Sequence, residues 1–99
     1  KKIKRNFGWC TDNKSNLYNK KIVNKKNIKH EKLFRKDYKY DLLIVISYNR
    51  KKIIKNKGSA IFLHLTKDYK PTAGCIGLKK KDFLILLKLI NKKTKIFIN

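Results

Sequence analysis

Acidic residues, proline, glycine and cysteine are scarce in this chain of 99 residues, and methionine is absent. No glycine-rich loop of the P-loop or dinucleotide-binding type is present, which argues against those nucleotide-binding sites. The two cysteines, Cys10 and Cys75, are too few for a disulfide scaffold. No CxxC pair or His/Cys cluster predicts a structural zinc site. No apolar run reaches the roughly eighteen residues of a membrane-spanning helix.

The length has room for one small domain with one sheet and one or two helices. The chain begins with Lys1 rather than methionine, and no apolar signal segment comes first. We therefore expect a fragment or a processed chain, in which residues 1–99 form a single, monomeric domain.

The formal net charge of +22 suggests nucleic-acid binding at first sight. Nearly all of this charge is lysine, however, and arginine occurs only at Arg5, Arg35 and Arg50. Lys, Asn and Ile are over-used together, which is the codon bias of an AT-rich genome. Phosphate clamps and base readout favour arginine, so we expect no specific nucleic-acid partner. Attraction to anionic cell-wall polymers or membrane surfaces is expected, and salt should weaken it.

The most informative stretch is 58–78, GSAIFLHLTKDYKPTAGCIGL. Residues 59–65 predict a buried strand, and a polar loop that ends at Pro71 leads to Cys75. A loop of this kind can bring His64 and Cys75 together, as a thiolate nucleophile and its base require. Gly74 gives the backbone freedom, so that successive N–H groups can point at a substrate oxygen. On spacing alone, an inert buried cysteine and a structural histidine remain the alternative.

The segments GSAIFLH and PTAGCIGL together resemble the L,D-transpeptidase catalytic domain, the YkuD-type cysteine enzymes of bacterial cell walls, in the branch with a PTAGC signature. The resemblance runs from about Phe7 to the C-terminus. It implies a mainly β fold with one or two helices: a β-sandwich or sheet with a covering C-terminal helix. The chain would be the C-terminal portion of the family domain, in the periplasm or cell envelope.

The resemblance also implies a mechanism on peptidoglycan stem peptides, with 3→3 cross-linking or L,D-carboxypeptidase activity as the outcome. Cys75 would be the nucleophile and His64 its base, with the backbone N–H groups of Ala73 and Gly74 as the oxyanion hole. No metal or organic cofactor is expected. The implied substrate-binding residues are Thr72, Tyr69 and Ser59.

Three positions depart from the pattern of better-known family members. Ala73 replaces a frequent histidine, and Gly77 stands where an arginine often follows the cysteine. Leu65 follows His64 and lacks the hydroxyl that orients the base in some members. We therefore expect a backbone carbonyl to orient the imidazole.

The rest of the chain predicts further elements. Residues 41–48 are almost continuously apolar and predict a central strand covered on both faces, joined by a hairpin-type connection to the strand 59–65. Residues 79–91 predict an amphipathic helix whose leucines belong to the core. Shorter predictions are a strand or turn at 7–10, a solvated loop at 20–29, His30 on the surface, and an edge strand at 94–98. The family resemblance implies a helical turn at 30–34.

Three other functions remain in competition with the enzyme. One is a catalytically silent, basic domain that binds the cell wall, and another is a small basic nucleic-acid-binding protein. The third is a non-functional fragment that does not fold. The enzyme leads because several residues in order support it.

Overall fold

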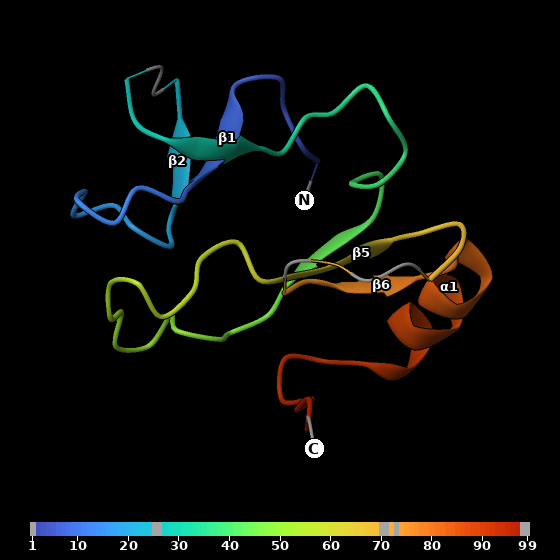
Figure 1. The fold of residues 1–99 in the computed structure, drawn as a ribbon. Helices are drawn as coiled ribbons and strands as arrows, with labels where there is room; N and C mark the ends of the chain where they lie inside the picture. Colours follow the sequence, from blue (N-terminus) through green and yellow to red (C-terminus); the bar gives the residue numbers. More distant parts are fainter. Residues whose placement is uncertain (1, 25–26, 70–71, 73, 98–99) are drawn as a thin grey trace.

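The computed structural model describes residues 2–24, 27–69, 72 and 74–97 (Figure 1). Over these residues the chain forms short strands followed by one helix. The elements are β1 Phe7–Cys10, β2 Lys21–Val23, β3 His30–Lys32, β4 Leu43–Val45, β5 Phe62–Leu65, β6 Ile76–Leu78 and α1 Lys80–Leu89.

The strands form two small sheets. The first has the order β2-β1-β3, with both pairs antiparallel. The second has the order β4-β5-β6, in which β4 is antiparallel and β6 parallel to β5. Figure 1 shows α1 following β6 and lying beside the second sheet. The expected mainly β fold with a covering C-terminal helix is therefore confirmed.

The core has two parts, and β5 contributes to both. Phe62 joins a cluster with Trp9, Leu33 and Tyr40, which links the two sheets. Leu63 and Leu65 join a cluster with Phe83 of α1, on the other side of β5. Successive side chains of a strand point to opposite faces, so β5 separates the two clusters. All four residues of β5 are buried for this reason.

The prediction of a central strand at 41–48 is wrong. The strand is shorter, Leu43–Val45, and lies at the sheet edge with only β5 beside it. Its residues are half-buried, and they contribute alternately to the two core clusters. The continuous apolar run reflects this two-sided packing, but the central position belongs to β5. The antiparallel connection between these strands is confirmed.

Two predictions in the first half are also wrong. The expected loop at 20–29 contains β2, where Ile22 is buried, and the expected helical turn at 30–34 begins with β3. Both segments become strands because β1 pairs with them on either side. His30 is half-buried rather than on the surface, since its ring packs over Gly8. The strand or turn expected at 7–10 is the central strand β1.

The predicted helix is confirmed as α1, but its leucines are not all in the core. Phe83 is buried, and Leu86 packs beside it, whereas Leu87 and Leu89 are exposed. Residues 94–97 form no strand, and position 98 of the expected edge strand lies outside the described residues. In the described segments, no helix has the length and apolar character needed to cross a membrane.

Asn19 connects the two sheets through four hydrogen bonds of its side chain. Its Oδ1 accepts from Trp9 Nε1 at 2.8 Å and from the backbone N–H of Ala60 at 3.3 Å. Its Nδ2 donates to the carbonyls of Tyr48 and Asn49, at 3.2 and 2.6 Å. Asn19 is 2% exposed and has a φ of 58°, which asparagine tolerates better than most residues. One amide therefore satisfies a donor of β1 and backbone groups near both ends of the connection between β4 and β5.

Replacement of this amide should be costly. We expect Asn19→Ala to lower the free energy of unfolding by about 2–4 kcal/mol, because it leaves buried polar groups unpaired. Asn24→Ala is the matched control, since Asn24 is exposed and has a similar φ of 56°. The control should cost only about 1 kcal/mol of backbone strain. Urea denaturation measures both, and equal losses would show that the amide bonds contribute little.

Candidate functional site

Cys75 and His64 lie on the same face of the second sheet. His64 is the register partner of Gly77 in the parallel pair of β5 and β6. Cys75 directly precedes β6 and is two residues from Gly77, so its side chain points to the same side. Cys75 packs against the cluster of Phe62, which shares its face of β5 with His64. The two predicted catalytic residues therefore lie toward the same face, on neighbouring chain segments.

The imidazole of His64 has a defined orientation. Its Nδ1 lies 2.8 Å from the backbone oxygen of Leu65, and the residue is 7% exposed. A carbonyl oxygen can only accept, so Nδ1 carries a proton, and in the neutral imidazole Nε2 is the atom with the lone pair. The expected orientation by a backbone carbonyl is thus confirmed, and Nε2 is the atom able to take a proton.

Tyr40 packs against this imidazole. The two rings meet at an interplanar angle of 61°, with their centroids 5.8 Å apart. The Tyr40 hydroxyl donates to Glu31 Oε1 at 2.8 Å. Burial is the larger cause that raises the pKa of Tyr40, and this hydrogen bond is the second. The phenol therefore stays protonated, with its ring between β3 and the face of β5 that carries His64.

Glu31 is itself held by a small ionic network. Arg35 Nη1 lies 3.4 Å from Glu31 Oε1, the same oxygen that accepts from Tyr40. Two further hydrogen bonds, of 2.9 and 2.6 Å, join Arg35 to Asp37. These bonds lower the pKa of Asp37 to about 2. The Arg35–Asp37 pair stays charged at neutral pH, and through Glu31 the network fixes the position of the Tyr40 hydroxyl.

The Cys75 thiol is half-buried and donates to the backbone oxygen of Ala60 at 3.2 Å. Ala60 has a φ of 59°, a left-handed conformation that is costly for alanine. Asn19 holds this residue through its N–H, so the bonds of Asn19 reach the cysteine by way of Ala60. In the part of the chain that the structure describes, no hydrogen bond joins the thiol to the imidazole.

Gly77 explains one departure from the pattern of better-known family members. A Cβ at this position would lie 3.1 Å from Cβ and Cγ2 of Thr66 and 3.7 Å from Cε1 of His64. A larger side chain such as arginine would crowd Thr66 and start beside the imidazole. Glycine therefore fits the close approach of β6 to the end of β5.

The loop before the cysteine contains the other predicted residues of the site. The Thr72 hydroxyl donates to the carbonyl of Cys75, which closes the turn on the cysteine itself. Gly74 is exposed, so its backbone is accessible from solvent. Ala73, the other predicted oxyanion residue, lies outside the described residues. Its role and that of Gly74 stay predictions.

The hydroxyls of Tyr69 and Ser59 bind within the chain. Tyr69 Oη donates to Asp82 Oδ2 at 2.6 Å and accepts from the N–H of Lys79, at the start of α1. Ser59 Oγ donates to the carbonyl of Cys10 at 2.5 Å. Tyr69 therefore ties the loop to the helix, and Ser59 ties the segment before β5 to β1. Their predicted contacts with substrate are untested.

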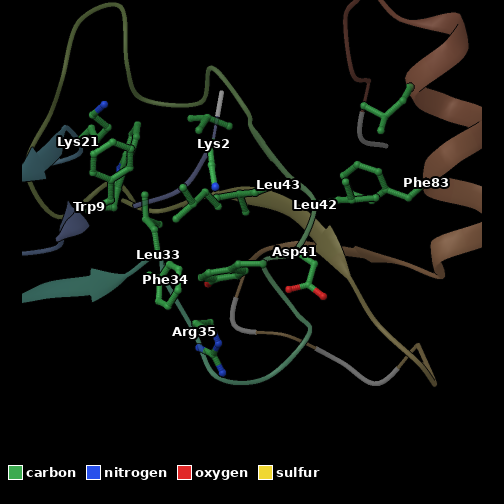
Figure 2. A pocket seen from close by; sticks show the side chains of 15 residues that line it. Lys2, Trp9, Lys21, Leu33, Phe34, Arg35, Asp41, Leu42, Leu43 and Phe83 are labelled. Carbon is green, nitrogen blue, oxygen red and sulfur yellow. The ribbon is translucent and has the colours of Figure 1, made fainter. Parts of the chain in front are cut away.

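A cavity of about 630 Å³ lies next to the site, and Tyr40 is among its lining residues. Figure 2 shows apolar side chains from both sheets around it, including Trp9, Leu33 and Leu43, with Phe83 from α1. Neither Cys75 nor His64 is among the described residues that line it. Among all the residues that the structure describes, no group of three or more His, Cys, Asp or Glu side chains is placed to hold a metal ion.

The two cysteines differ in access, which alkylation can test. Cys10 is fully buried, whereas Cys75 is partly exposed. We expect iodoacetamide to label Cys75 in the folded protein and Cys10 only after denaturant is added, because the reagent must reach the sulfur. Peptide mass spectrometry reads the two sites separately. Cys75→Ser is the control and should leave the folded protein unlabelled; early labelling of Cys10 would contradict the packing of β1.

Comparison with known proteins gives one match. A family model described as YkuD, the L,D-transpeptidase catalytic domain, matches residues 1–98. Neither curated proteins nor solved structures give a significant match. The matched range includes both sheets, α1, and the facing residues His64 and Cys75.

Proposed function

The chain belongs to the YkuD family of L,D-transpeptidase catalytic domains, and from this premise we propose that it transfers acyl groups of peptidoglycan stem peptides through Cys75. One observation carries the proposal: Cys75 and His64 share a face of the second sheet, with Nε2 of the imidazole free to accept a proton. A nucleophile beside an oriented base is what covalent catalysis requires.

In the first step the thiol leaves the Ala60 oxygen by rotation about its Cα–Cβ bond and transfers its proton to Nε2 of His64. The sulfur attacks the carbonyl carbon of the third stem residue, and a tetrahedral intermediate forms. Its collapse breaks the amide bond, and the imidazolium returns the proton to the departing D-alanine amine. The product is a thioester on Cys75, and the Leu65 carbonyl keeps the imidazole in one orientation throughout.

In the second step an amine of a neighbouring stem attacks the thioester. His64 takes the proton of this amine and returns it to the sulfur, which leaves as the thiol. The result is a 3→3 cross-link, and water in place of the amine gives L,D-carboxypeptidase activity. Backbone N–H groups at Ala73 and Gly74 are the proposed donors to the oxyanion in both steps.

The proposal includes the setting of the reaction. Peptidoglycan lies in the cell envelope, so we place the protein in the periplasm or envelope, acting as a monomeric domain over residues 1–99. Its positive charge of +22 favours contact with anionic wall polymers. Thr72, Tyr69 and Ser59 are the proposed contacts to the stem peptide.

Covalent capture tests the proposed nucleophile. We expect incubation with a carbapenem or a tetrapeptide stem to add mass to the peptide that contains Cys75, because the acyl group remains on the sulfur. Cys75→Ala should abolish the adduct and all acyl transfer. Cys10→Ala is the matched control, since it removes a buried sulfur of β1 and should leave acylation intact. A folded protein that stays unmodified would overturn the proposal.

Tyr40 is the proposed positioning residue for His64. Tyr40→Leu removes the ring that packs against the imidazole, and we expect acylation to slow by about 10- to 100-fold because the base loses its orientation. Tyr40→Phe keeps the ring and loses only the hydrogen bond to Glu31, so acylation should stay within a few-fold. Stopped-flow acylation rates on folded protein measure both. Equal rates in the two variants would contradict a role for the ring.

A catalytically silent wall-binding domain is the second candidate. The observation that favours it is the thiol's hydrogen bond to Ala60 rather than to His64. Salt-sensitive binding to isolated sacculi that is unaffected by Cys75→Ala, together with no adduct, would support this candidate over the enzyme.

A further inference from the structure

The outward face of α1 carries exposed apolar side chains. Phe83 is buried and defines the side of the helix that faces the sheet. Ile85 and Leu89 point away from it, and they lie one turn apart on the same face. Ile85 is 52% exposed and Leu89 is 75% exposed. The segment after the helix adds two more exposed apolar side chains, Ile96 and Phe97.

Positive charge surrounds these side chains. Residues 79–97 contain seven lysines and a single acidic residue, Asp82. Lys81 precedes Ile85 by one turn and extends its row, while Lys88 lies beside it on the helix. Asp82 is bound by the Tyr69 hydroxyl, which places its carboxylate at the loop end of the helix. The surface thus combines exposed aliphatic groups with uncompensated cations.

An anionic lipid bilayer satisfies both features better than a second copy of this chain or a nucleic acid does. A second copy of this chain would offer apolar contacts but would bring another net charge of +22 against the lysines. A nucleic acid would offer phosphates, but the exposed helical side chains Ile85 and Leu89 are aliphatic and give its bases no stacking platform, and Phe97 adds a single ring. An anionic lipid bilayer offers negative headgroups above an apolar interior, which suits a helix that lies in the interface.

We propose that α1 and the segment that follows it to residue 97 bind the surface of an anionic lipid bilayer. Ile85 and Leu89 enter the boundary between headgroups and acyl chains, while lysines such as Lys81 and Lys88 contact lipid phosphates. The ten-residue helix lies along the interface and does not cross the membrane.

The fold keeps this surface apart from the candidate site. α1 packs on the face of β5 that carries Leu63 and Leu65, whereas His64 points to the opposite face. Membrane contact through α1 therefore does not cover the face of β5 that carries His64. The proposal is independent of catalysis, and its test has no activity readout.

The test is flotation of the protein with vesicles of mixed phosphatidylglycerol and phosphatidylcholine. We expect binding to these vesicles, weaker binding as salt increases, and little binding to pure phosphatidylcholine. The double variant Ile85→Gln/Leu89→Gln keeps the net charge and should lose at least about tenfold in affinity, because it removes the apolar groups that enter the bilayer. Circular dichroism verifies that the helix is retained.

A matched control separates this face from general charge attraction. Ile54→Gln/Val23→Gln also removes two exposed aliphatic side chains without changing the charge, and Ile54 is 52% exposed, like Ile85. The control should bind vesicles like the unmodified chain. Equal effects of the two double variants, or unchanged binding of the helix variant, would overturn the proposal. The proposal would also be overturned if the chain self-associated or bound an oligonucleotide and only the Ile85→Gln/Leu89→Gln variant abolished that binding. The face would then serve that other partner.

Discussion

The side-chain amide of Asn19 is the contact on which the arrangement of the two sheets depends. Short strands of three or four residues provide few ladder hydrogen bonds, so each sheet alone is weak. Asn19 joins Trp9 of β1 to the backbone on both sides of the loop between β4 and β5. Through Ala60 the same amide reaches the thiol of Cys75. A residue of the turn between β1 and β2 thus holds the backbone that accepts from the candidate nucleophile.

The central position of β5 separates two tasks. One face carries Phe62 and His64 toward Tyr40 and the half-buried thiol. The other face carries Leu63 and Leu65 toward α1, which leaves the outward side of the helix to solvent. Alternation along β5 is therefore sufficient to place His64 on one side of the strand and α1 on the other.

Several basic side chains lie over aromatic rings. Lys21 lies over Phe7 at 4.1 Å, and Lys67 lies over Tyr38 at 4.5 Å. Arg50 stacks over Trp9 in the same way, beside the hydrogen bond to Asn19. These contacts let long basic side chains cover apolar surface while their charged ends stay in water. The charge is therefore compatible with a small core and remains available for anionic partners.

Local pattern in the sequence was sufficient for β5, for α1 and for the placement of His64 and Cys75 on neighbouring segments, because each is encoded within one short stretch. The lack of a hydroxyl at Leu65 also predicted correctly that a backbone carbonyl orients the imidazole. The strands β2 and β3, the edge position of β4 and the contact of Tyr40 with His64 were decided by tertiary structure alone. Each depends on pairing between segments distant in sequence, which no local periodicity records. The role of Asn19 belongs with them: its four partners lie 10 to 41 residues away, and only the folded chain brings them to one amide.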